Sequence, residues 1–395
     1  MKGRIGLWRF LPLTALFFLL AGCGEDRLTA LDPYGPQAQW ILDNMILSLY
    51  VMALVIIVVF TLFFIAVVKF RRRPGDDEIP KQVEGSKVLE ITWTVIPVIL
   101  LAILAVPTIW GTYYMAEEAP EAAGSSGGEQ ENAEGEEGED SGEEPDNAEE
   151  AEEEGALVID VTGHQFWWQF DYPDGFSAGN EVYIPTNQKV WFDLSASDVI
   201  HSFWVPALGG KIDTIPGVDN SMWLEANEPG VYKGKCAELC GPSHALMDFK
   251  VIAMEPEEYE AWEESMTGQE ASGEGESSEE EASEEEQSSG NEGSEEGDTA
   301  ASEGRQVFED QGCIGCHAVE GQGTGQGPTL SNFADREKIA NVLDVNNENL
   351  EGWIRNPDDF KQGNNMPASP DMSDEDMDAI IEFLNSLSAE EDMNQ

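Results

Sequence analysis

Two long apolar segments dominate the pattern of hydrophobic and polar positions in the first third of the chain. Met45 to Val68 is an almost uninterrupted apolar run of 24 residues. As a helix it would be about 36 Å long, enough to cross a hydrocarbon core of about 30 Å. A second run extends from about Val88 to Trp110 and contains Pro97 and Pro107, which membrane helices tolerate where neighbouring helices satisfy the freed carbonyl groups. The pattern therefore predicts a two-helix transmembrane hairpin within residues 23–116.

Charged residues beside these segments predict their orientation. The first segment is followed by the basic residues Lys69, Arg71, Arg72 and Arg73, and a short loop of this kind is expected on the cytoplasmic side. Both ends of the hairpin should then face outwards. Glu90 lies near the cytoplasmic start of the second segment. An ionisable side chain there is either a functional group or an interfacial carboxylate that reaches back to water.

The first residues have the pattern of a secretory signal. Lys2 and Arg4 precede an apolar run from Phe10 to Leu20 that is too short to span a bilayer. The small residues before Cys23 resemble a bacterial lipobox, which implies a signal peptide over residues 1–22 and lipidation of the Cys23 thiol. An uncleaved signal anchor is the alternative.

After the hairpin the pattern of apolar residues first becomes strand-like and then helical. Short segments separated by turn signals run from Leu157 to Ile252 and predict a small all-β sandwich over residues 155–258. The expected strands lie at residues 157–161, 166–172, 182–184, 189–194 and 231–234. Helical segments at residues 305–311, 350–354 and 373–387 then predict a small all-α domain over residues 301–395.

Composition adds two acidic tracts to this organisation. The formal net charge is -58, and Gly, Ser, Ala and Glu dominate residues 117–154 and 259–300. Such segments bury too little apolar surface to offset their ordering entropy, so both are expected to be disordered linkers. A chain this acidic repels nucleic acid, which excludes that class of partner.

The chemistry of the chain centres on one loop. Two thiols, an imidazole and a thioether occur there at Cys236, Cys240, His244 and Met247, and His201 lies 35 residues upstream of Cys236. Thiolate and thioether ligands favour copper, and two thiolates four residues apart can bridge two copper ions. A structural disulfide would leave the His and the Met unexplained. A zinc site of two Cys and two His would leave Met247 unexplained.

A second metal-binding pattern lies near the start of the helical domain. Cys313-x-x-Cys316-His317 is the attachment motif of c-type haem, in which both thiols bind the haem covalently and the adjacent His becomes an axial iron ligand. A thioredoxin-like redox motif would need a βαβ context, whereas this motif follows a helix.

A methionine is expected to supply the sixth iron ligand. Met366 in an Asn-Met-Pro loop matches the class I cytochrome c pattern, because such a loop can present its sulfur. Met372 competes for this role, as does Met377, which lies on the expected final helix.

The stretch from about Asp43 to Pro256 resembles subunit II of haem-copper cytochrome c oxidases, and the C-terminal domain resembles a fused class I cytochrome c, as in the caa type. This resemblance implies a cupredoxin-like sandwich with a dinuclear copper centre (CuA). The implied ligands are the side chains of His201, Cys236, Cys240, His244 and Met247 and the backbone carbonyl of Glu238.

The same resemblance assigns roles to two carboxylates. It implies that Glu90 stands at the entrance of a proton channel that leads into subunit I. The carboxylate of Glu238 is also expected to bind a Mg²⁺ or Mn²⁺ ion at the boundary with subunit I, because hard cations prefer oxygen ligands.

The implied function is electron transport in a proton-pumping oxidase. Electrons would pass from cytochrome c or an upstream respiratory complex to the haem, then to copper, and then to subunit I, where oxygen is reduced. The chain would lie in the bacterial plasma membrane with other oxidase subunits, its copper and haem domains on the outer face. The alternatives are a copper-containing nitric oxide reductase subunit, and a membrane-bound electron carrier or copper-delivery module without catalysis.

One aromatic position departs from the family pattern. Relatives commonly carry a Trp after Gly-His-Gln, through which soluble cytochrome c reduces copper, whereas this chain has Phe166 followed by Trp167 and Trp168. We therefore expect electrons to enter through the haem at Cys313 and Cys316, since the tether holds that haem at a high effective concentration. The alternative is that Phe166 only packs in the sandwich core and that copper accepts electrons directly.

Overall fold

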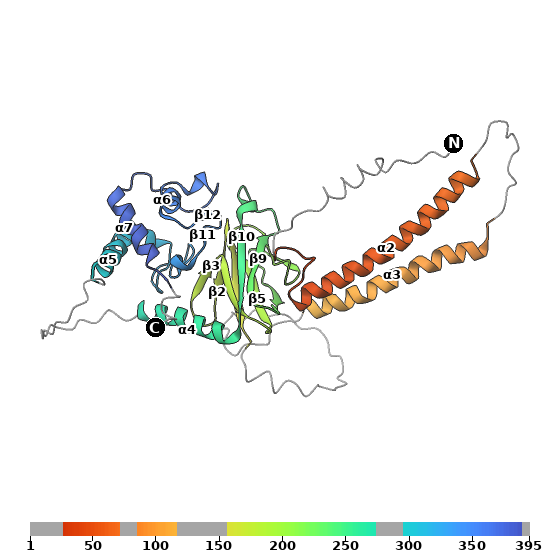
Figure 1. The fold of residues 1–395 in the computed structure, drawn as a ribbon, viewed down its shortest axis with the longest axis horizontal. Coiled ribbons are helices and arrows are strands. Elements are labelled where there is room, and N and C mark those ends of the chain that lie inside the picture. The colour runs from red at the N-terminus through yellow and green to blue at the C-terminus, as the bar shows by residue number, and fades with distance from the viewer. Residues whose placement is uncertain (1–26, 72–84, 117–155, 274–294, 389–395) are drawn as a thin grey trace, which may run out of the picture.

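The computed structural model describes residues 27–71, 85–116, 156–273 and 295–388 (Figure 1). The described residues form a helical hairpin, a β-sandwich and a small helical domain. The predicted signal peptide over residues 1–22, the lipidation residue Cys23 and most of the two acidic tracts lie outside these ranges.

The N-terminal part is the predicted hairpin. Helix α2 comprises Pro36–Lys69 and helix α3 comprises Lys87–Met115, and both are long and apolar enough to cross a membrane. Pro97 and Pro107 lie inside α3. Most apolar side chains of both helices are exposed, and a contiguous apolar surface of this size marks a membrane or protein interface.

Aromatic side chains join the hairpin to the sandwich. The ring of Trp110 lies 4.7 Å from Trp40 and stacks on Tyr114 at 5.4 Å. Trp223 of the sandwich packs edge-on against Tyr114 at 5.4 Å, and Gln37 Nε2 donates a 2.7 Å hydrogen bond to Trp223 O. Each such aromatic pair contributes about 0.5–1.5 kcal/mol of stabilisation beyond its buried area. These stacked rings therefore hold the sandwich at one end of the hairpin (Figure 1).

The sandwich consists of two five-stranded sheets. The first has the order β3-β2-β1-β5-β8, with β1 Val158–His164, β2 Trp167–Asp171, β3 Ser177–Gly179, β5 Val190–Ala196 and β8 Asn220–Leu224. The second has the order β4-β10-β9-β6-β7, with β4 Glu181–Pro185, β6 His201–Trp204, β7 Lys211–Thr214, β9 Gly230–Cys236 and β10 Asp248–Met254. The pairs β1·β5 and β4·β10 are parallel and the others antiparallel. This arrangement confirms the predicted all-β class.

Large aromatic side chains fill the space between the sheets. Phe203 stacks on Phe249 with ring centres 4.5 Å apart, and Trp168 packs edge-on against Phe203 at 5.6 Å. Strand β6, which carries Phe203, is buried at three of its four positions. It therefore lacks the alternation of buried and exposed residues that is seen in β1. Without this alternation, the sequence did not predict β6 as a strand.

Helix α4, Pro256–Gly273, departs from the sequence prediction. The acidic linker was expected to begin at residue 259, but Tyr259, Trp262 and Met266 are buried in the core of the sandwich domain. Trp262 stacks on Tyr183 of β4 at 4.3 Å. The acidic composition masked three apolar residues at helical spacing, and burying this stripe orders the first part of the tract.

The C-terminal domain is helical, as predicted. It contains α5 Glu295–Asp310, α6 Asn347–Arg355 and α7 Asp374–Asn385, with a two-stranded ribbon of β11 Lys338–Ile339 and β12 Leu343–Asp344. Helix α5 begins within the tract that was expected to be disordered up to residue 300. Phe308 of α5 packs against Phe383 of α7 with ring centres 5.6 Å apart.

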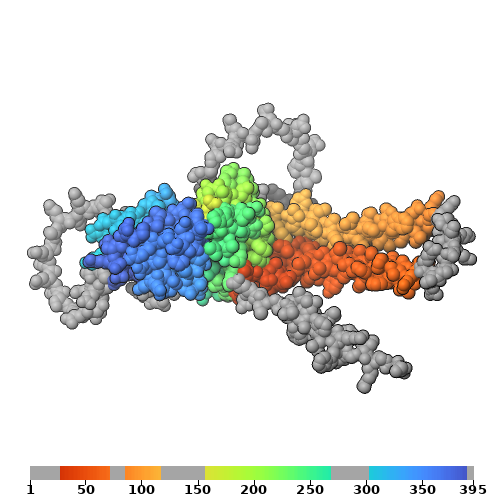
Figure 2. Space-filling view, turned by 90° about the horizontal axis from the view of Figure 1, so that it is seen from above, coloured from red at the N-terminus to blue at the C-terminus, as the bar shows by residue number. Residues whose placement is uncertain are grey.

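The three parts lie in a row. In Figure 2 the sandwich separates the orange and red hairpin from the blue helical domain. The helical domain therefore contacts the sandwich on the side away from the hairpin.

Candidate metal centre and haem cavity

The second sheet of the sandwich brings the predicted copper ligands together. Strand β9 ends at Cys236 and β10 begins at Asp248, so the loop between these two neighbouring strands carries Cys240, His244 and Met247. Strand β6 pairs with β9 on its other side and starts with His201. Residues 35 positions apart thus become neighbours through strand pairing.

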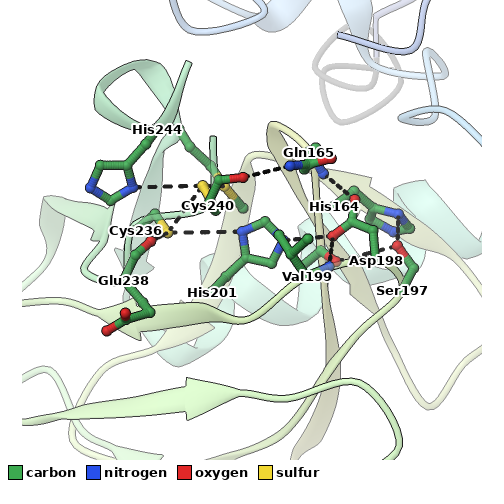
Figure 3. Close-up of polar contacts among 12 residues, drawn as sticks. His164, Gln165, Ser197, Asp198, Val199, His201, Cys236, Glu238, Cys240 and His244 are labelled. Atoms are coloured by element: carbon green, nitrogen blue, oxygen red, sulfur yellow. Dashed lines mark hydrogen bonds and ion pairs between the residues drawn. The ribbon is translucent and has the colours of Figure 1, made fainter. Parts of the chain in front are cut away.

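The donor atoms of this loop form one cluster (Figure 3). Cys236 Sγ lies 3.8 Å from Cys240 Sγ and 3.9 Å from His201 Nδ1. Cys240 Sγ lies 3.6 Å from His244 Nδ1 and 3.8 Å from Met247 Sδ. A disulfide has a sulfur separation of about 2.05 Å, so the two thiols are free and lie at a distance that metal ions can bridge.

Glu238 contributes its backbone to the same cluster. Its carbonyl oxygen lies 3.2 Å from Cys236 Sγ. Its side chain is exposed, and Figure 3 shows the carboxylate turned away from the sulfur atoms. The carbonyl of Glu238 therefore faces the sulfur cluster, while its carboxylate faces outwards.

A hydrogen-bond network that the sequence did not reveal orients the ligands. Asp198 Oδ1 lies 2.8 Å from His201 Nε2, which directs Nδ1 of that ring towards the thiols. Gln165 N donates to Asp198 Oδ2 at 2.6 Å, and Gln165 Nε2 donates to Cys240 O at 2.5 Å. Asp and Gln are common surface residues, so the sequence held no signal for this role. Only their position beside the expected ligands identifies Asp198 and Gln165 as supporting residues.

The electrostatics of the cluster prepare it for a cation. Hydrogen bonding from Cys240 and then from His201 lowers the pKa of Cys236 well below its usual value, against the opposing effect of burial. The neighbouring Cys236 raises the pKa of Cys240. Burial opposes charge on the His201 ring, but hydrogen bonds with Cys236 and Asp198 raise its pKa. The two thiols therefore differ in how readily they lose a proton, and binding of a metal by both as thiolates requires release of the remaining thiol protons.

His164, to which the sequence assigned no role, lies outside the cluster. Its Nδ1 lies 2.8 Å from Ser197 Oγ and its Nε2 lies 3.1 Å from Gln169 Oε1. Its ring stacks on Trp167 at 4.4 Å. Both ring nitrogens are engaged, so His164 supports the turn before β2.

The helical domain encloses a cavity of about 390 Å³ at the haem motif. Cys313, Cys316, His317 and Met366 all line it. His317 Nδ1 lies 2.8 Å from Pro328 O, which fixes the ring and leaves Nε2 for a metal. Burial lowers the pKa of His317 and so favours the neutral imidazole that binds iron.

The other residues of the cavity also suit a haem group. Apolar side chains of Phe308, Leu350, Ile354 and Leu384 form part of its wall. The guanidinium of Arg336 is buried there, and its Nε has no hydrogen-bond partner among the described residues. A flat apolar group that carries anionic substituents matches this lining.

Of the three candidate methionines, Met366 alone lines the cavity among the residues that the structure describes. Met377 is buried in the domain core on α7. Met372 packs against that core from outside. The geometry therefore favours the loop methionine.

Comparisons with known proteins agree with both sites. Models of the transmembrane and periplasmic domains of cytochrome c oxidase subunit II match residues 30–110 and 175–254, and a cytochrome c model matches residues 301–388. Cytochrome c oxidase subunit 2 of Alkalihalophilus pseudofirmus is 57% identical over 381 residues, which are 96% of each protein. The chain belongs to the cytochrome c oxidase subunit II family.

Two further relatives have lower identity. Cytochrome c oxidase subunit 2 of Bacillus subtilis is 38% identical over 97% of this chain and 98% of that protein. Quinol oxidase subunit 2 of Bacillus cereus is 32% identical over 66% of this chain and 81% of that protein. This subunit II is therefore a membrane component of a haem-copper oxidase and a partner of subunit I, and its domains imply CuA copper and haem c as cofactors.

In this subunit II the cytochrome c domain docks on the copper loop. Ser243, which precedes the expected ligand His244, donates a 2.7 Å hydrogen bond from Oγ to Gln362 O. Gln362 lies four residues before Met366. An added Cβ on Gly363 would lie 3.2 Å from Pro242 Cγ, which shows how closely the two loops pack.

Polar contacts support this docking at its edge. Lys250 Nζ lies 3.0 Å from Glu181 Oε1 of the sandwich and 3.0 Å from Glu337 Oε2 of the cytochrome domain. Asn341 Nδ2 donates a hydrogen bond to Asp248 O. Phe166 and Trp167 of the sandwich also line the haem cavity. The cavity is thus completed by both domains.

Proposed function

We propose that electrons pass through this subunit from a covalently bound haem c to the dinuclear copper centre and then to subunit I. The haem would be held by Cys313, Cys316, His317 and Met366. The copper ions would be held by the side chains of His201, Cys236, Cys240, His244 and Met247 and the carbonyl of Glu238. Bound haem and copper supply one-electron redox chemistry, while the protein positions both groups and excludes water.

The observation that carries this proposal is the direct packing of the two ligand loops. The Ser243–Gln362 hydrogen bond joins the loop of His244 to the loop of Met366. A donor domain that contacts the acceptor's own ligand loop needs no diffusing partner to deliver its electron. We further propose cytochrome c or an upstream respiratory complex as the external donor, and the outer face of the bacterial plasma membrane as the location of both domains.

Purification of the whole complex provides the test. We expect two copper ions and one covalent haem in this subunit, and consumption of oxygen when reduced cytochrome c is supplied. Consumption of nitric oxide without oxygen would instead indicate a reductase. A complex that contains both cofactors but transfers no electron from haem to copper would refute the proposed route.

Glu238→Gln is expected to remove a Mg²⁺ or Mn²⁺ ion from the complex while copper remains. The substitution keeps the backbone carbonyl near Cys236 but removes the exposed carboxylate, and hard cations require such oxygen ligands. Metal analysis of the purified complex checks this result. Glu228→Gln, at an exposed carboxylate on another loop, is the matched control and should retain both metals. Retention of the hard cation in Glu238→Gln would refute this second role.

Glu90→Ala is expected to slow oxygen turnover by about tenfold, which corresponds to about 1.4 kcal/mol of activation free energy. Glu90 lies in the first turn of α3 with its side chain exposed, at the end proposed to be cytoplasmic. The copper and haem spectra should not change, because both cofactors lie beyond the other end of the hairpin. Turnover of the complex is compared with that of Lys87→Ala, a change of charge at the same helix start. Full turnover in Glu90→Ala would mean that this carboxylate only contacts water.

A further inference from the structure

Lys361 is a buried cation between the haem cavity and the copper loop. Its side chain is only 3% exposed, although lysine is almost never fully buried unless its charge is paired. It lies between the short turn Pro357–Asp359 and Met366, and it lines the haem cavity. Lys361 is not one of the proposed copper or haem ligands, so those roles do not explain why it is buried.

The described residues satisfy only part of its bonding capacity. Lys361 Nζ donates a 2.9 Å hydrogen bond to Ala340 O. An ammonium has three donors, and among the described residues Lys361 has no carboxylate within ion-pair distance. Burial of an unpaired charge is costly. The ammonium is therefore poised to bind an anion.

Charges of the sandwich reach this position from the other side. Burial lowers the pKa of Lys361 to about 8, whereas Asp248 and Cys240 favour its charged form. Lys235 Nζ donates hydrogen bonds to both carboxylate oxygens of Asp248, to Oδ1 at 2.9 Å and to Oδ2 at 2.8 Å. The carboxylate of Asp248 is thus already paired with Lys235. The residue after Ala340, Asn341, donates from Nδ2 to Asp248 O at the end of the copper loop, so the Lys361 ammonium bound to Ala340 O lies on the copper side of the cavity.

Arg336 provides a second, independent observation in the same cavity. Its Nη2 donates to Thr329 O at 2.6 Å and to Asn332 Oδ1 at 2.8 Å. Its Nε is buried without a partner among the described residues. The buried Lys361 and the partly buried Arg336 thus both have donors to spare in a cavity whose expected occupant, haem, carries two carboxylate groups.

We propose that Lys361 binds a carboxylate of haem c on the side of the cavity that faces the copper loop. The inference rests on the proposed binding of haem c in this cavity. In this role Lys361 is a positioning residue: it neutralises one carboxylate at the junction of the two domains. Its charge also stabilises an added electron on the neighbouring haem, because a cation in a medium of low dielectric favours the reduced form.

The test is an optical redox titration of haem c in the purified complex. Lys361→Gln keeps a hydrogen-bond donor but removes the charge, and it is expected to lower the midpoint potential of the haem. Lys361→Arg retains the charge and should restore a potential close to that of the wild type. Arg355→Gln is the matched control, because Arg355 belongs to the same domain, is paired with Glu351 and Asp374, and is not among the described residues that line the cavity. It should leave the potential unchanged.

Each outcome decides the proposal. An unchanged potential in Lys361→Gln with haem bound would refute it, as would an equal fall in Arg355→Gln. If Lys361→Gln loses haem while Lys361→Arg retains it, the requirement for charge is supported. Loss of haem from both variants would instead indicate a packing role and overturn the proposal. A wild-type complex without haem c would refute the proposed function itself, which separates the two failures.

Discussion

Cys240→Ser is expected to abolish the dinuclear copper centre. Cys240 Sγ lies within 3.6–3.8 Å of His244 Nδ1, Cys236 Sγ and Met247 Sδ, so it contacts three other donors of the cluster. A serine hydroxyl is a harder ligand and stays protonated, so it does not bridge two copper ions as a thiolate does. The copper content should fall below two ions per chain, and the spectrum of the coupled pair should disappear.

Copper reconstitution of residues 156–273 measures this effect. The fragment includes α4, because Tyr259, Trp262 and Met266 belong to the sandwich core. Met247→Leu is the matched control at the thioether ligand, and it should keep two copper ions with an altered spectrum, since a thioether is a weak ligand. A Cys240→Ser fragment with the spectrum of the wild type would overturn the ligand assignment.

Removal of the chain after Gly273 is expected to leave a copper-loaded complex that external donors reduce poorly. Covalent attachment to the sandwich gives the haem domain an effective concentration in about the millimolar range. At micromolar concentrations of a soluble donor, we expect copper reduction to slow by roughly 100-fold or more. The sandwich alone retains Phe166 at the position where relatives carry the expected Trp, and Phe166 is only 2% exposed while the haem domain is docked.

Stopped-flow reduction with cytochrome c compares this truncated complex with the full-length complex. A variant with Cys313→Ala and Cys316→Ala separates the haem from the domain, because it keeps the chain but loses the covalent attachment. Both forms should be slow. Reduction of copper in the truncated complex at the rate of the full-length protein would show that copper accepts electrons directly and that Phe166 has only a packing role.

Local patterns in the sequence were sufficient for the main features of the fold. The transmembrane hairpin followed from apolar length, and the helical domain followed from the periodicity of α6 and α7. Strand β6 and the packing of α4 were missed. Both depend on what covers a segment, since β6 is buried without alternation and the apolar stripe of α4 lies within an acidic tract.

The sequence by itself was enough to predict the chemistry of both sites. Cys236 to Met247 and Cys313 to His317 each fit within one loop, so ligand type and spacing can be read directly from neighbouring residues. The tertiary structure alone decided which residues support them. Asp198 and Gln165 act on copper ligands, and Lys361 reaches the junction between two domains, only because strand pairing and docking bring distant segments together. Hydrogen bonds and charges act through distance in space, which the order of residues along a chain does not specify.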